Sequence, residues 1–145
     1  MCSSDLAAIA MVFVGRASDL SGERRWHLAF CAGVGALGLV LASMTRSPLL
    51  SLGALSIAAA GIWGTFGPFW AMPPEFLSGT AAAGAIALIN SIGNLGGFAG
   101  PYLVGIVKQT THSFAGGMIV MAASLVAAGM IALTLPVPVR ETEQS

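Results

Sequence analysis

The chain has 145 residues, of which 56% are hydrophobic and only 8% are charged, and its formal net charge is zero. A water-soluble domain carries about 25% charged residues, because a folded surface must be hydrated. The composition therefore excludes a water-soluble globular domain and predicts an integral membrane protein. The balanced charge also argues against a nucleic-acid partner, because it leaves no basic surface to meet phosphates.

The first apolar run, residues 6–14, is short. At about 1.5 Å per helical residue it would cover less than half of a ~30 Å hydrocarbon core. A secretory signal would have its basic segment first, whereas here Asp5 precedes the run and Arg16 follows it. Residues 1–6, MCSSDL, match one reading frame through the end of a common sequencing adapter, so we exclude them from the expected fold. We expect residues 7–14 to be the end of a truncated transmembrane helix.

Four longer uncharged segments follow, each close to or above the ~20 residues that a transmembrane helix needs. Lipid offers no hydrogen bonds to the backbone, so helices are the expected form. The sequence thus predicts an all-α integral membrane fold with spans at residues 28–44, 49–72, 80–107 and 114–135. Pro101 should kink the third span, because it leaves the carbonyl four residues earlier without a donor, and Ser78 and Thr80 are candidate N-caps for it.

The basic residues near the span ends predict the orientation. Four lie on one side of the predicted spans and two on the other: Arg16, Arg24, Arg25 and Arg140 against Arg46 and Lys108. Because positively charged loops stay in the cytoplasm, we expect the loop 15–27 and the polar, disordered tail 136–145 to be cytoplasmic.

The loop GRASDLSGERR resembles the G-x-x-x-D-R-x-G-R-R loop of the major facilitator superfamily of transporters. The matching residues are Gly15, Asp19, Gly22, Arg24 and Arg25. In that family the motif lies between helices two and three and, in weaker form, between helices eight and nine. Four spans after the loop fit the second position. The resemblance therefore implies the end of helix eight and helices nine to twelve of a twelve-helix transporter.

The same resemblance implies that the loop acts as a conformational latch. Asp19 would be the acid and Arg24 or Arg25 its partner, in a contact that is made in one conformation and broken in the other. The chain has Leu20 where the family has arginine and Glu23 where it has a basic residue, so the pairing should be weaker or different. The alternative is a solvated loop that only orients the chain.

A second resemblance covers residues 66–105. The segments PPEFLSGTAAA and NSIGNLGGF are similar to helices ten and eleven of the anion:cation symporter branch of that superfamily. Bacterial members of this branch take up tartrate, sugar acids or aromatic carboxylates. The resemblance implies proton-coupled symport of an organic anion across a bacterial inner membrane, without a cofactor. The missing N-terminal helices would supply the charged site residues. An exporter of amphipathic compounds and a non-transporting membrane scaffold are the alternatives.

Asn90 and Asn94 lie one helical turn apart near the middle of the third span, and they are the main candidate substrate contacts. An amide that faces lipid is costly, so both should face protein or a water-filled cavity. Ser91, Trp63 and Thr65 are further candidates. Interhelical hydrogen bonding and simple packing are the alternatives. The residues around the next turns include two G-x-x-x-G pairs and predict close helix packing: Gly93, Gly96, Gly97, Gly100 and Pro101.

Three other features carry no chemistry in this interpretation. GVGALG, residues 33–38, matches a dinucleotide-binding pattern, but it lies inside an apolar span, so its glycines should serve packing. His27 and His112 are expected in loops without a ligand array, so no metal site is predicted. Glu75 is expected near the start of a helix, where the dipole favours an acid. Without a nucleophile–base pair, we do not expect an enzyme.

Overall fold

The computed structural model describes residues 3–135, and in this range the chain forms helices and no strands. The helices, in chain order, are α1 (Ser3–Ser21), α2 (Arg24–Met44), α3 (Pro48–Gly64), α4 (Phe66–Ala71), α5 (Pro73–Phe76), α6 (Gly79–Thr111) and α7 (Phe114–Thr134). Four segments are long and apolar enough to cross a membrane, namely α2, the run α3–α5, α6 and α7. The expected all-α membrane fold is confirmed.

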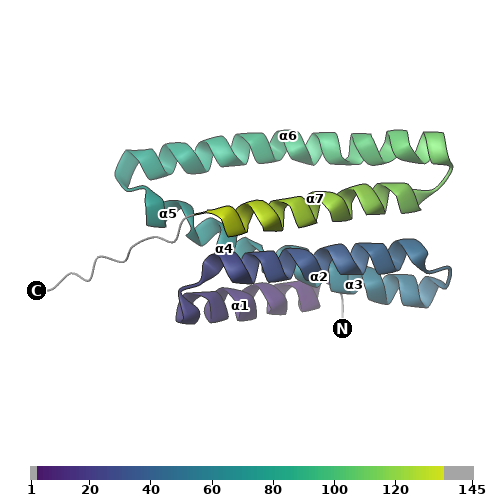
Figure 1. Ribbon diagram of the computed structural model, residues 1–145, viewed down its shortest axis with the longest axis horizontal. Helices are drawn as coiled ribbons and strands as arrows, with labels where there is room; N and C mark the ends of the chain where they lie inside the picture. The colour runs from purple at the N-terminus through teal and green to yellow at the C-terminus, as the bar shows by residue number, and fades with distance from the viewer. Residues whose placement is uncertain (1–2, 136–145) are drawn as a thin grey trace, which may run out of the picture.

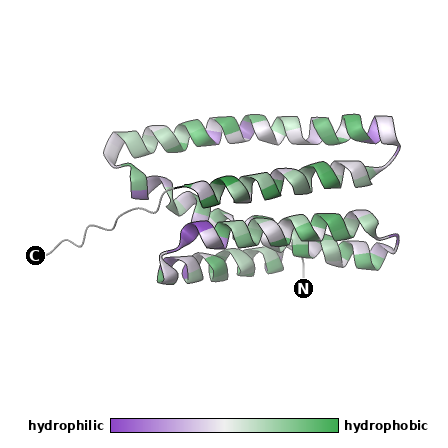
Figure 2. Cartoon of the chain, viewed as in Figure 1, coloured by the Kyte–Doolittle hydropathy of each residue, from purple (hydrophilic) through white to green (hydrophobic). Residues whose placement is uncertain are grey.

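The long helices lie side by side in the order α6, α7, α2 and α3 (Figure 1). Helix α2 packs against both α7 and α3, while α1 packs mainly on α3 and α4. Among the described elements, α6 contacts only α7 and the short α5. Figure 2 shows hydrophilic residues at the α1–α2 turn and at other helix ends, and two hydrophilic patches in the middle of α6. The molecule is therefore a row of apolar helices with α6 at one edge.

The crossing of α2 and α3 depends on residues without side chains. A Cβ placed on Gly38 would lie 2.5 Å from the backbone nitrogen of Ala58, and one placed on Gly61 would overlap the backbone of Gly35. Helices in lipid associate by close packing, and glycine permits the closest approach. The GVGALG segment therefore packs helices, as predicted, although its Gly33 faces open space.

The second span is interrupted near its middle. Helix α3 ends at Gly64 and α4 begins at Phe66, and between them the N–H of Thr65 donates to the carbonyl of Ile62 at 3.2 Å. Pro68 has no N–H for the carbonyl of Gly64, four residues earlier, and this missing hydrogen bond accounts for the break.

The third span is longer than predicted and forms one helix of 33 residues. Ser78, rather than Thr80, is its N-cap, although its side chain makes no capping hydrogen bond. Pro101 lies inside the helix, which continues through it (Figure 1). The proline expected to kink the third span therefore does not divide it, whereas Pro68 does divide the second.

Helix α1 corrects the expected N-terminal organisation. The sequence predicts a loop over residues 15–27, but α1 continues to Ser21 and α2 begins at Arg24. Only Gly22 and Glu23 remain between the helices. Gly22 has a φ of +69° and donates its N–H to the carbonyl of Ser18 at 3.0 Å, which is a left-handed helix end that glycine favours.

The sequence predicts that residues 1–6 come from an adapter and that residues 136–145 form a disordered tail. Residues 3–6, part of the segment attributed to an adapter, continue α1 without a break. Residues 1–2 and the tail 136–145, which was expected to be disordered, lie outside the described residues.

Candidate functional site

An ion-pair cluster joins the α1–α2 turn to α5. The Arg24 Nη2 atom lies 3.2 Å from Oδ1 of Asp19, and its Nε atom lies 2.9 Å from Oε1 of Glu75. The Arg24 side chain is 17% exposed, against 64% for Asp19 and 26% for Glu75. One partly buried guanidinium thus holds two carboxylates from segments that are distant in sequence, and the Glu75 pair is the better shielded from water.

The residues of the motif take different positions around this cluster. Arg25 does not pair with Asp19, because its Nη1 donates to the carbonyl of Leu135, just after α7, at 3.3 Å. Gly15 faces α4, where a Cβ on Gly67 would lie 2.9 Å from the Gly15 Cα. The motif residues therefore connect α1 and α2 to α4, α5 and α7. That they act as a latch stays a prediction.

Glu75 is the site residue that sequence reasoning missed. The sequence predicts a loop acid near the next helix, and the structure places it in the first turn of α5, paired with Arg24. Its partner lies beyond two intervening helices, so no local spacing reveals the pair. One signal was available, because Glu75 is the only acid between Glu23 and Glu141 and lies on the same predicted side as the arginines.

The middle of α6 exposes an uncharged polar face. Asn90 and Asn94 are both exposed, and neither side-chain amide forms a hydrogen bond with any other residue of the described range. Ser91 is also exposed and donates its hydroxyl to the carbonyl of Ala87 at 2.9 Å. Two unpaired amides at mid-helix are costly in lipid, so this face requires protein or water against it.

The predicted packing residues lie on the same open part of α6. An ideal Cβ would meet no atom within 4 Å at any of the four glycines, Gly93, Gly96, Gly97 and Gly100. Pro101 is exposed, and α6 has no buried residue. Within residues 3–135, therefore, no helix packs against these glycines, and their packing role stays a prediction.

The aromatic candidates lie elsewhere in the row of helices. Trp63 is 47% exposed and stacks on Phe66, with 4.9 Å between the ring centroids. Thr65 is half-buried and donates its hydroxyl to the carbonyl of Ile62 at 2.7 Å. The helices on either side of Thr65, α3 and α4, make no contact with α6. The structure therefore does not bring Trp63 and Thr65 together with the α6 amides.

The two histidines lie at helix ends rather than in loops. His27 is in the first turn of α2, where its Nδ1 lies 2.9 Å from the carbonyl oxygen of Glu23. His112 follows α6 as its C-cap, in the left-handed conformation with a φ of +54°. Within the described range, no three His, Cys, Asp or Glu side chains are placed to hold a metal ion.

Comparison with known proteins extends these observations. No family model matches the chain, and no solved structure gives a significant match. The chain is 47% identical over 129 residues to an Agrobacterium vitis protein named as a tartrate transporter, with 89% of this chain and 30% of the relative covered. It is 38% identical over 110 residues to a quinolone resistance transporter of Acinetobacter baumannii, with 76% and 25% covered. It is 36% identical over 124 residues to the inner membrane transport protein RhmT of Escherichia coli K12, with 86% and 29% covered.

The chain spans about 30% of the length of the curated relatives it matches. These relatives are membrane transporters of one type, and the row of membrane-length helices agrees with such a protein. The motif residues of the α1–α2 turn and the alignments together show that this chain belongs to the major facilitator superfamily of membrane transporters.

Proposed function

We propose that the chain is the C-terminal part of a secondary transporter that takes up an organic anion together with protons by alternating access. The observation that carries this proposal is the uncharged polar face in the middle of α6, where the side-chain amides of Asn90 and Asn94 are exposed and have no partner in the part of the chain that the structure describes. An amide donates and accepts hydrogen bonds, so it can bind the hydroxyl and carboxylate groups of a sugar acid or tartrate. The 47% identity to a protein named as a tartrate transporter supports this substrate class.

The chemistry is divided between this chain and the rest of the transporter. An organic anion needs a cation opposite its carboxylate, and proton coupling needs a group that titrates. Residues 28–44, 49–72, 80–107 and 114–135 contain no charged side chain and no histidine. The charged and titrating groups would therefore come from the remaining helices, while this part supplies neutral contacts from Asn90, Asn94 and Ser91, and from Trp63 and Thr65.

The Arg24 cluster supports the conformational part of the proposal. Arg24 connects the α1–α2 turn to Glu75 of α5, so a movement that separates these segments must break the 2.9 Å contact. A half-shielded ion pair has a modest free energy, so it can bias two states without locking one of them. In a bacterial inner membrane, as in the name of the RhmT relative, the basic residues would place this turn on the cytoplasmic side.

Export of an amphipathic compound is the second candidate function. The observation that favours it is the 38% identity to a quinolone resistance transporter. The exposed Trp63, stacked on Phe66, offers the aromatic surface that a planar drug would contact. The direction of transport separates the two candidates.

The test is uptake by the full-length transporter in proteoliposomes, with labelled tartrate, a sugar acid and a quinolone as substrates. An inward proton gradient should drive accumulation of one organic anion, and dissipation of the gradient should abolish it. The whole chain of 145 residues, reconstituted alone, is the control and should accumulate nothing. Quinolone transport without transport of any organic anion would overturn the proposal in favour of the exporter.

A further inference from the structure

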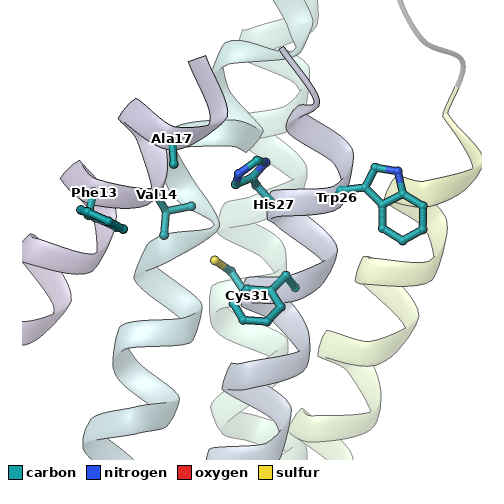
Figure 3. A pocket seen from close by; sticks show the side chains of 7 residues that line it. Phe13, Val14, Ala17, Trp26, His27 and Cys31 are labelled. Carbon is teal, nitrogen blue, oxygen red and sulfur yellow. The ribbon is translucent and has the colours of Figure 1, made fainter. Parts of the chain in front are cut away.

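An apolar groove lies between α1 and α2, beside the turn that joins them. It has a volume of about 460 Å³ and is lined by residues of both helices: Phe13, Val14, Ala17, Trp26, His27, Phe30 and Cys31. Figure 3 shows the His27 ring and the Cys31 side chain on the side of α2 that faces α1. The groove exists because α1 packs mainly on α3 and α4 and contacts α2 much less.

The groove has a polar mouth and an apolar interior. Along α2 it extends from Trp26 to Cys31, which is about 8 Å of helix rise. Its one ionisable side chain near the turn is His27. A backbone carbonyl only accepts hydrogen bonds, so Nδ1 of His27 donates to Glu23, which leaves Nε2 as a hydrogen-bond acceptor.

One uncommitted cation lies next to the groove. Arg24 is held by two carboxylates, and Arg25 donates to the carbonyl of Leu135. The Arg16 side chain is exposed and makes no ion pair or hydrogen bond within the described range. It lines a neighbouring hollow together with Phe13, which also lines the groove, so Phe13 is the residue that the two features share.

We propose that this groove binds an anionic phospholipid, with an acyl chain along its apolar wall and the phosphate held by Arg16. The wall begins at the charged end of the helices, where a membrane protein meets the lipid headgroups, and basic pockets between helices at that level bind anionic headgroups. Trp26 is 55% exposed there, and tryptophan is enriched at the level of lipid headgroups.

The cation beside the groove argues against a further helix as its occupant. A transmembrane helix seated there would leave the Arg16 guanidinium beside apolar surface, which is costly without an acidic partner.

Quenching of Trp26 fluorescence by brominated lipids tests the proposal. The whole chain, carrying Trp63→Phe and Trp70→Phe so that Trp26 is its only tryptophan, is reconstituted in phosphatidylcholine. A small fraction of lipid is then replaced by phosphatidylglycerol or phosphatidylcholine with brominated acyl chains. We expect the anionic lipid to occupy the groove about fivefold more than the neutral one, as a single cation near the headgroups implies.

Two variants locate the binding. Arg16→Gln, an exposed substitution, should remove about fivefold of this preference, whereas Arg46→Gln at the opposite end of α2 should leave it unchanged. Ala17→Leu should fill the groove and reduce quenching by both lipids. Equal quenching by the two lipids, or a preference that Arg16→Gln leaves intact, would overturn the proposal.

The same measurement on the full-length transporter, with Trp26 again its only tryptophan, tests whether a further helix occupies the groove instead of a lipid. If neither brominated lipid quenched the fluorescence of Trp26, a further helix would fill the groove. That result would also overturn the proposal. Because the readout is fluorescence and not transport, failure of this proposal leaves the proposed function unaffected.

Discussion

Helices α2 and α6 are both rich in glycine and uncharged through their middle, yet they occupy opposite environments. In α2, Gly35 and Gly38 are buried against the backbone of α3. In α6, no residue is buried, and its mid-helix glycines face open space in the part of the chain that the structure describes. Glycine permits two helices to approach closely, but it does not determine which helix becomes the partner. The partner depends on which helices are present.

The two helices also differ in polar content. The buried face of α2 is apolar, with Leu28, Cys31 and Leu39 among its buried residues. On the open face of α6, the side-chain amides of Asn90 and Asn94 have no hydrogen-bond partner among residues 3–135. An apolar face can be satisfied by another apolar helix, whereas amides need a polar partner, which here we propose to be the substrate cavity.

The largest expected effect is at the α2–α3 crossing. Gly61→Leu would drive a side chain into the backbone of Gly35, so we expect a loss of about 3 kcal/mol or more in the free energy of unfolding, or no folded protein. Gly33→Leu on α2 is the control, because a Cβ there meets nothing within 4 Å. Unfolding in mixed micelles by increasing denaturing detergent measures both. Equal stability of the two variants would contradict the assigned crossing.

The next effect concerns transport by the full-length protein. Asn90→Ala should lower substrate uptake about tenfold, because it removes hydrogen bonds to a charged ligand worth about 1.5 kcal/mol. Gln109→Ala, which removes an exposed amide near the end of α6, should not change uptake. Membrane abundance, measured by immunoblot, should be equal in both. Undiminished uptake by Asn90→Ala would assign this amide to helix packing.

A smaller effect is expected at the ion-pair cluster. Glu75→Gln should lower the free energy of unfolding by about 1 kcal/mol, because it removes the better shielded partner of Arg24. Asp19→Asn should cost less, since the Asp19 side chain is 64% exposed. Glu23→Gln is the control, because Glu23 forms no ion pair within the described residues. Detergent-induced unfolding would rank the three, and a larger loss for Asp19→Asn would reverse the assigned roles.

The smallest effect is expected on α6, and it should have opposite signs in the chain alone and in the full-length transporter. Gly96→Ala in the chain alone should stabilise α6 by up to about 1 kcal/mol, because alanine has the higher helix propensity and no neighbour obstructs its Cβ. In the full-length transporter the same change should be destabilising, if another helix packs there. Gly84→Ala, also open on α6, should stabilise both forms. A gain for Gly96→Ala in both would show that this face stays open.

The sequence predicts the spans well but the ends of helices poorly. Spans follow from hydropathy, because lipid forces each backbone segment to satisfy its own hydrogen bonds. The loop predicted over residues 15–27 is mostly helix, because charged residues such as Arg16 and Asp19 mark a membrane boundary without breaking a helix. The sequence also does not reveal which of the two prolines inside the spans interrupts its helix. Pro68 divides its span, while α6 continues through Pro101.

The amino-acid sequence by itself determined that this protein lies in a membrane, where its four spans run, and which motif residues relate it to a transporter family. Only the tertiary structure decided that Arg24 pairs with Glu75, that Gly38 is buried while Gly96 is open, and that α1 and α2 leave a groove. The physical reason is the range of the forces. Hydropathy acts on each segment separately, whereas ion pairs and glycine contacts depend on which helices packing brings together.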